Sequence, residues 1–141
     1  MGVAETSDRV DAAMARLEEQ VRRLAEGIST TVSTMGLIDV LFRRAPKPLI
    51  VGTMEAWLLV SESFAAGLGY SAAELERRDW RSLLCSPSEV EETQLLLDKA
   101  GPVVGHVMTY RHRDGRCIPV LWHWSEADET GISIAMGEFV G

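Results

Sequence analysis

Histidine and cysteine are the residues of this chain whose side chains could hold a metal ion. His106, His112 and His123 fall on neighbouring predicted strands. Cys117 is close to them in the sequence. Side chains alternate between the two faces of a strand, so these candidates are divided between faces, and His112 lies beside a predicted hairpin. We therefore interpret the histidines as exposed or hydrogen-bonded side chains, and we predict no metal site.

Short catalytic motifs are absent from the sequence. It contains no GxSxG nucleophile motif, no glycine-rich phosphate loop and no HExxH zinc motif. We predict that the protein has no catalytic residues and is not an enzyme. The two cysteines, Cys85 and Cys117, lack the short spacing of a zinc site or a disulfide framework, which favours a reduced, cytoplasmic setting.

The charge and hydropathy of the chain argue against two classes of partner. Its 141 residues carry a formal net charge of -7, whereas non-specific nucleic-acid binding depends on clustered Lys and Arg. No apolar run approaches the roughly 20 residues that span a membrane, and the N-terminus lacks the features of a signal peptide. We expect one domain with an extra element at one end, in contact with neither nucleic acid nor membrane.

Residues 46–141 are predicted to form the domain, because strand and helix patterns follow one another there. The patterns predict strands at 49–52 and 57–60, helices at 61–68, 72–77 and 87–100, and strands at 103–113, 116–126 and 132–140. Asp114 and Gly115 are typical of a hairpin turn between two of these strands. This order predicts an α+β fold with one five-stranded antiparallel sheet and helices on one face.

Residues 1–45 are predicted to form a long helix with a coiled-coil seam. The apolar residues recur in steps of four and three, which is the heptad spacing of helices that pair. The seam comprises Val10, Met14, Leu17, Val21, Leu24, Ile28, Thr31, Met35, Ile38 and Phe42. We assign the interface of a predicted homodimer to these residues, except Val10 and Thr31.

An alternative is that this N-terminal helix is amphipathic and lies on its own domain. A strict seam of two apolar positions per heptad is narrower than the stripe of such a helix, which favours a partner helix. Gly27, Gly36 and the Ser and Thr residues between them are poor helix formers, so the sequence leaves open whether the helix is continuous there. Pro46 and Pro48 end it.

Three stretches of the domain resemble the PAS family of sensor modules. They are WLLVSESFAAGLGYSAAEL at 57–75, YRHRDGRCIPVLW at 110–122 and DETGISIAMGEFV at 128–140. They are similar, in this order, to the family's central strand and helices, its two strands joined at an Asp-Gly turn, and its last hairpin and strand. The resemblance covers residues 46–140 and implies a PAS-like fold with a role in sensing or association.

The resemblance also implies where a ligand would bind. In the family's register, His106, Met108 and Tyr110 face the helices, and Trp122 lies either with them or on the outer face of the sheet. Together with Cys85, these are the candidate ligand-binding residues. The alternative is an ordinary filled core.

Two cofactors of the family can be weighed against the sequence. Haem-binding relatives often place a histidine on the long helix, and segment 87–100 has none, so we do not expect haem. Light-sensing flavin relatives carry a reactive cysteine in an Asn-Cys-Arg motif, whereas Cys85 lies in Leu-Leu-Cys-Ser-Pro and is interpreted as a buried apolar side chain. Flavin held without covalent chemistry stays open, with Trp80, Trp122 and Trp124 either lining its pocket or filling the core.

We expect a cytoplasmic homodimer that senses a signal. It would bind a small ligand or cofactor and pass the signal through its N-terminal helix or to a partner signalling protein. The competing interpretation is a ligand-free PAS module for protein–protein interaction and dimerisation. The resemblance does not name the ligand, because fold does not fix function.

Overall fold

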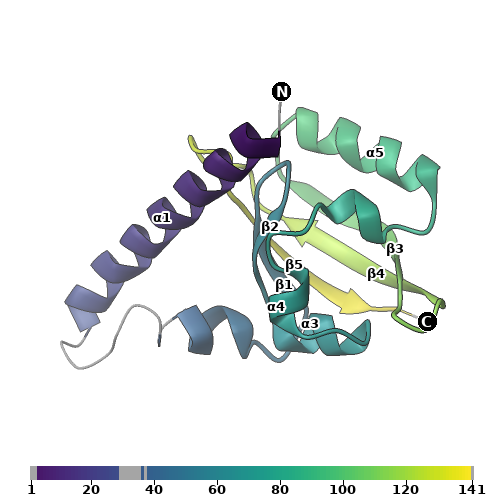
Figure 1. Ribbon diagram of the computed structural model, residues 1–141, viewed down its shortest axis with the longest axis horizontal. Coiled ribbons are helices and arrows are strands. Elements are labelled where there is room, and N and C mark those ends of the chain that lie inside the picture. Colours follow the sequence, from purple (N-terminus) through teal and green to yellow (C-terminus); the bar gives the residue numbers. More distant parts are fainter. Residues whose placement is uncertain (1–2, 29–35, 37, 141) are drawn as a thin grey trace.

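The computed structural model describes residues 3–28, 36 and 38–140, and within the N-terminal helix it describes the side chains of residues 8–23. Its elements are α1 (Val3–Ile28), η1 (Asp39–Arg43), β1 (Leu49–Gly52), β2 (Trp57–Val60), α3 (Glu62–Gly67), α4 (Ala72–Leu75), η2 (Trp80–Leu83), α5 (Pro87–Asp98), β3 (Val103–Arg111), β4 (Cys117–Trp124) and β5 (Ser133–Phe139). The five strands form one antiparallel sheet in the order β2-β1-β5-β4-β3. The predicted α+β class is confirmed (Figure 1).

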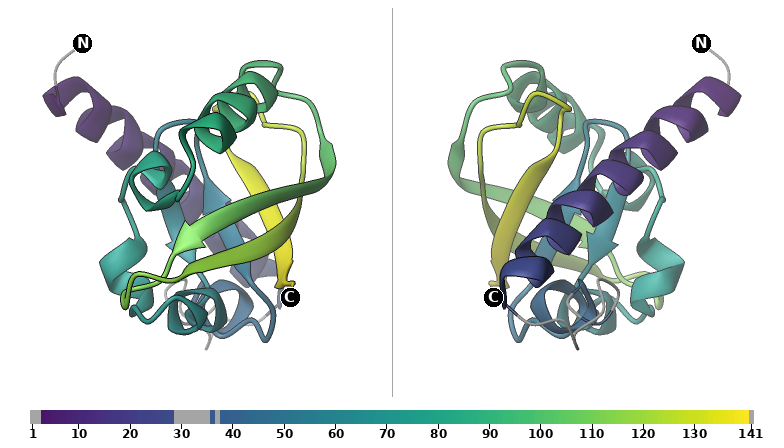
Figure 2. Two further views of the ribbon diagram at one scale, coloured as in Figure 1. Left: turned by 90° about the vertical axis from the view of Figure 1, so that its right-hand side faces the viewer. Right: turned by 90° about the vertical axis from the view of Figure 1, so that its left-hand side faces the viewer.

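The sheet has a helical layer on each side. The helices α3, α4 and α5 cover one face, which we call the inner face, as the order of elements predicts. The helix α1 crosses the opposite, outer face over β1 and β2 (Figure 2). The inner layer, with η2, encloses the larger of the two apolar cores, and this core contains the candidate site.

Short local signals fix the helices of the inner layer. Ser61 is the N-cap of α3, and its Oγ accepts a hydrogen bond from the N–H of Phe64 (3.4 Å) and one from the N–H of Leu49 (2.9 Å). One buried hydroxyl therefore caps the helix and ties it to β1. Ser71 and Glu74 form the predicted capping box at the start of α4.

The helix α1 packs against the chain's own sheet. The buried cluster that it forms with the outer face contains Val10, Ala13, Leu17, Val21, Ile38, Val51, Ala56, Leu58, Leu59 and Ile132. Although a partner helix was favoured, the described part of the seam lies on the chain's own sheet, as in the alternative of an amphipathic helix on its own domain. The physical reason is the width of the stripe, because Ala13 joins the apolar positions and widens the seam into a face.

The residues assigned to a helix–helix interface are divided by this arrangement. Leu17, Val21 and Ile38 are buried within the chain, and Met14 and Phe42 are partly buried at the margin of the same cluster. The side chains of Leu24 and Ile28, and all of Met35, lie outside the described residues. The described part of α1 reaches Ile28, and η1 is the next described element, so the continuity of the helix from Gly27 to Gly36 falls outside the described residues.

Cys85 and Cys117 are joined by a disulfide bond, with their Cα atoms 6.3 Å apart. Cys85 precedes α5, and its N–H donates to the carbonyl of Thr109 in β3 (2.9 Å). Cys117 begins β4, so the bond reaches across β3. The predictions that both cysteines are reduced, and that Cys85 is a buried apolar side chain, are wrong. Sequence spacing did not show the pair, because the sheet brings together residues 32 positions apart.

Candidate functional site

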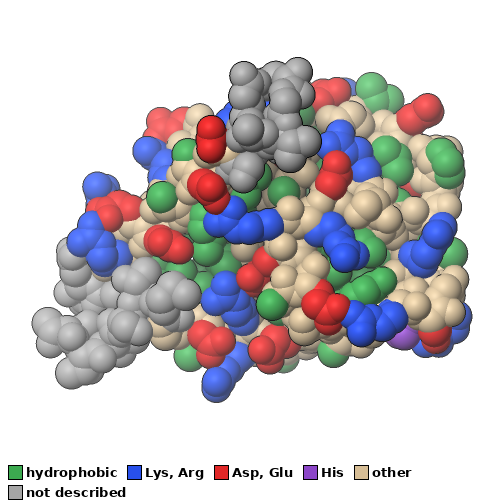
Figure 3. Space-filling model, in the orientation of Figure 1, with side chains coloured by type: hydrophobic (Ala, Val, Ile, Leu, Met, Phe, Trp, Pro, Cys, Tyr) green, Lys and Arg blue, Asp and Glu red, His purple; other side chains and the backbone are tan. Residues whose placement is uncertain are grey.

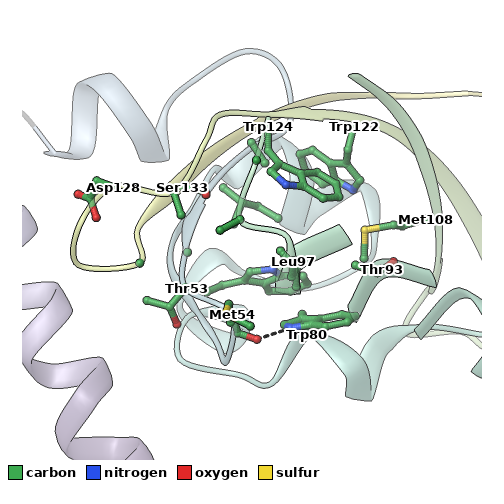
Figure 4. A pocket seen from close by; sticks show the side chains of 18 of the residues that line it. Thr53, Met54, Trp80, Thr93, Leu97, Met108, Trp122, Trp124, Asp128 and Ser133 are labelled. Atoms are coloured by element: carbon green, nitrogen blue, oxygen red, sulfur yellow. Dashed lines mark hydrogen bonds between the residues drawn. The ribbon is translucent and has the colours of Figure 1, made fainter. Parts of the chain in front are cut away.

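A cavity of about 300 Å³ lies between the inner face of the sheet and the helices η2 and α5 (Figure 4). This volume is at the lower end of the range for small-molecule sites. Its walls are formed by Ile50, Gly52, Thr53, Met54, Trp57, Trp80, Thr93, Leu97, Ala100, Gly101, Met108, Tyr110, Trp122, Trp124, Ala127, Asp128, Glu129, Gly131, Ser133 and Ala135. The lining is mainly apolar and aromatic.

All four tryptophans of the chain line this cavity. Trp122 and Trp124 are two residues apart on β4, so their side chains share the inner face. Trp57 comes from β2 and Trp80 from η2. In Figure 4, Trp122 and Trp124 lie on one side of the hollow and Trp80 on the other. A bound molecule would therefore meet indole rings on two walls.

The deepest polar atoms of the cavity are paired with one another. The indole Nε1 of Trp122 donates to the Tyr110 hydroxyl (2.7 Å), and this hydroxyl donates to the sulfur of Met108 (3.4 Å). Burial raises the pKa of Tyr110, and the hydrogen bond from Trp122 lowers it by less. The phenol therefore stays neutral, and the floor of the cavity presents no charge.

The wall beside α5 is held by a histidine that lies behind it. The Thr93 hydroxyl is 2.8 Å from Nε2 of His106, and the His106 ring meets Trp124 edge to face at 5.7 Å. Partial burial lowers the pKa of His106, although the carboxylates of Glu92 and Glu89 raise it by less. His106 thus supports Thr93 and Trp124 without lining the cavity itself.

The charged residues of the lining are both acidic. Asp128 Oδ1 accepts hydrogen bonds from the N–H of Thr130 (2.8 Å) and of Ile132 (3.0 Å), and Glu129 forms an ion pair with Arg16 of α1 (2.7 Å). Partial burial raises the pKa of Asp128, but the hydrogen bonds and the charge of Arg16 outweigh it and lower the pKa overall. Asp128 is therefore a carboxylate near neutral pH.

Three of the five predicted ligand-binding residues line the cavity. They are Met108, Tyr110 and Trp122, and the structure places Trp122 on the inner face. His106 shares that face but lies behind Thr93 and Trp124. Cys85 is half-buried in its disulfide bond and lies outside the lining.

Several lining residues were not among the predicted site residues. Trp124 and Trp80 had been weighed as lining for a flavin, and the alternation along β4 already places Trp124 on the face of Trp122. Trp57 lies at the start of a short, fully buried strand, where periodicity cannot distinguish the two faces. Thr93 carried no such signal, because its burial in α5 and its partner His106 are visible only in the folded chain.

The lining can be tested against the two cofactors considered for the family. The indole walls and Met108 suit the flat ring of a flavin, but no Lys or Arg among the described lining residues could pair with its phosphate. Cys85 is bonded to Cys117 and cannot form a flavin adduct as a free thiol. None of the described lining residues is a histidine, so the axial ligand that was considered for haem does not face the cavity.

The described part of the chain has neither a metal-binding cluster nor a membrane-spanning helix. No group of three or more His, Cys, Asp and Glu side chains within it is arranged to hold a metal ion. No helix within it is long and apolar enough to cross a membrane.

Comparison with solved structures shows that the chain has the PAS fold. The PAS domain of an HTR-like protein from Haloarcula marismortui is 21% identical, with a TM-score of 0.63, over 87% of this chain and 99% of that one. The LOV domain of a blue-light activated histidine kinase from Erythrobacter litoralis is 17% identical, with a TM-score of 0.60, over 70% and 99%. A PAS domain of a LuxR-family transcriptional regulator from Burkholderia thailandensis, solved in complex with ethanol, is 16% identical, with a TM-score of 0.61, over 72% and 96%.

No family model and no curated protein matches the sequence. At these levels of identity the likeness establishes the fold and leaves the function to the site.

Proposed function

We propose that this protein is a sensory module that binds a small, largely apolar molecule in the tryptophan-lined cavity of its PAS fold. The observation that carries the proposal is the cavity itself. It brings every tryptophan of the chain to one space of about 300 Å³, while its inner polar atoms are already paired. An ordinary core would fill this space with side chains, since protein interiors are close-packed.

Contacts of α1 support a route by which occupancy could be transmitted. Arg9 pairs with Glu55 in the β1–β2 turn (2.7 Å), and Arg16 pairs with Glu129 in the β4–β5 loop (2.7 Å). Both segments contribute residues to the cavity's lining. Figure 3 shows Lys and Arg side chains interspersed with Asp and Glu side chains over the face of the molecule seen in Figure 1. We propose that a ligand moves these segments and thereby changes how α1 lies on the outer face.

The output of the module would be a partner signalling protein or another part of the same assembly. Among the similar structures, one belongs to a histidine kinase and another to a transcriptional regulator. The PAS domain solved with ethanol is an example of this fold with a small molecule. A cytoplasmic setting stays a prediction, and the disulfide bond removes the argument for it from cysteine spacing.

The proposal is tested by titrating the protein with a cationic and a neutral aromatic probe, benzyltrimethylammonium and its carbon isostere neopentylbenzene. Because the four tryptophans surround the cavity, their fluorescence should change saturably with at least one probe, and the Tm should rise with probe concentration. Mass spectrometry of the supernatant of denatured protein, purified from its native host, would identify a natural ligand.

A matched pair of substitutions controls for the position of binding. Ala135→Leu fills the cavity and should abolish the saturable response. Ile134→Leu changes the adjacent residue, which is exposed on the outer face, and should leave the response intact. An unchanged response in Ala135→Leu, or no saturable response to either probe in the wild type, would contradict binding in this cavity.

A second candidate function, self-association, is favoured by the outer face beside α1. Val104, Val107, Ile134 and Met136 are exposed there, with Met136 at 54% and Val104 at 85%. Exposed apolar side chains gathered on one sheet face are typical of an association surface. We propose that a second copy of the chain covers this face, in place of the interface first assigned to α1.

A further inference from the structure

We propose that the molecule recognised in the tryptophan-lined cavity is an organic cation whose charged group is a quaternary ammonium. This inference rests on the proposed function and specifies the chemical class of its ligand. Three features of the lining carry it: the indole rings, the sign of the charges, and the hydrogen bonds that already occupy the polar groups of Tyr110, Trp122 and Trp80.

The indole rings supply the attraction. The face of an aromatic ring carries partial negative charge, and tryptophan attracts cations more strongly than tyrosine or phenylalanine does. Trp122 and Trp124 come from one wall, and Trp57 and Trp80 come from other elements, so a bound group would be surrounded by rings. The cavity lies within the buried inner core, where a cation would lose water and where such contacts are strongest.

The charges of the lining also favour a positively charged ligand. Asp128 and Glu129 are acidic, and the described lining includes no Lys, Arg or His. Arg16 neutralises part of the Glu129 charge, whereas Oδ2 of Asp128 takes no part in the hydrogen bonds that Oδ1 accepts. An anion would meet two exposed carboxylates, one of them paired with Arg16, and would find no basic side chain among the described lining residues.

Several hydrogen-bonding groups of the lining are already occupied, which favours a cation that makes no hydrogen bonds of its own. The Tyr110 hydroxyl and the Trp122 indole N–H bond to each other, and the Trp80 indole N–H donates to the Met54 carbonyl (2.9 Å). The sequence contains no asparagine, and no glutamine lies among the described lining residues, so amide recognition of a flat polar ligand is missing. A quaternary ammonium has no N–H groups and leaves none unsatisfied.

The test compares pairs of ligands that have the same shape and differ in charge. Benzyltrimethylammonium is compared with neopentylbenzene, and choline with 3,3-dimethylbutan-1-ol, by tryptophan fluorescence and by thermal shift. Each cation should bind about tenfold more tightly than its neutral isostere, the difference expected from a desolvated cation–π contact.

The outcomes separate this inference from the proposed function. Equal affinities, or tighter binding of the neutral member, would overturn the cation inference and leave the cavity as a site for neutral molecules. Failure of all four compounds to bind saturably would overturn the inference together with binding in the cavity.

Two substitutions, with a control, locate the recognition. Asp128→Asn keeps the oxygen that accepts from Thr130 and Ile132 but removes the charge, and should weaken cation binding roughly twofold to fivefold with no effect on the isostere. Trp124→Leu should weaken cation binding about tenfold, after circular dichroism has shown that the variant folds. Glu126→Gln removes an exposed carboxylate outside the lining and should change neither affinity. Equal losses for both members of a pair would overturn the assignment of charge recognition to these residues.

Discussion

Trp122 forms the inner wall of the cavity, and its position depends on the absence of a side chain at Gly137. Gly137 is its neighbour on β5, and a Cβ there would lie 2.7 Å from the indole ring and 2.9 Å from the carbonyl of Leu121. The indole can therefore lie over β5, while its N–H reaches the hydroxyl of Tyr110. A residue without a side chain thus helps to shape the wall of the candidate site.

His106 gives the folded protein a predictable dependence on pH. Its folded pKa is below the ordinary value of 6.5, so between the two pKa values the unfolded chain binds more protons than the folded one. This contribution to stability is complete at higher pH and is lost as pH falls below about 6.5. The groups that face His106 from α5 are Thr93, Glu89 and Glu92.

We predict that, as the pH is lowered below about 6.5, the free energy of unfolding decreases less steeply in His106→Gln than in the wild type. The free energy is measured by urea denaturation at each pH. Equal slopes in the two proteins would show that other groups set the dependence.

Two fixed points attach the start of α5, and with it one wall of the cavity, to the sheet. Glu89 in its first turn accepts hydrogen bonds from the N–H and the hydroxyl of Thr109 (2.6 and 2.8 Å). The disulfide bond from Cys85 to Cys117 is the other attachment. Because the bond closes a loop between residues 32 apart, removing it should cost about 3 to 4 kcal/mol.

The prediction is that Cys117→Ser, compared with oxidised wild type in urea, unfolds at a lower midpoint. Reduced wild type is the matched control and should resemble the variant. An unchanged midpoint, or alkylation of both thiols in the native oxidised protein, would show that the bond is absent in solution.

At the scale of the whole molecule, α1 covers only part of the outer face of the sheet. The helix α1 covers β1 and β2, whereas the part of the outer face on β3, β4 and β5 exposes Val104, Val107, Ile134 and Met136. Two substitutions can distinguish the part that folds the chain from the part that would join two chains. Leu17 is buried against the chain's own sheet, and Met136 is exposed beside it.

We predict that Leu17→Ala lowers the free energy of unfolding by about 2 to 5 kcal/mol at every protein concentration, because the space left by the shortened side chain lies within one chain. Met136→Asp should leave a folded monomer by light scattering, because a charge would be buried only in the complex. A Leu17→Ala loss that depends on concentration would instead place α1 between two chains. A Met136→Asp dimer of unchanged mass would exclude the exposed face as the interface.

Local patterns in the sequence determined most of the fold. The strands β1 and β2 have the predicted bounds, because they are short apolar runs between turn residues. The Ser71–Glu74 capping box depends on residues within one helical turn, and the alternation along β4 placed Trp122 and Trp124 on one face. Such features involve neighbours in the sequence, so a local pattern is sufficient to predict them.

Tertiary structure decided the features that depend on distant residues. The sheet order β2-β1-β5-β4-β3 brings Cys85 to Cys117, and it gathers four tryptophans from three elements around one cavity. The sequence also did not determine which surface α1 packs against. A stripe of apolar residues indicates that one face of a helix is buried, but it does not identify the surface that buries it. Here the chain's own outer face is that surface, because Val51, Leu59 and Ile132 present apolar side chains to the stripe.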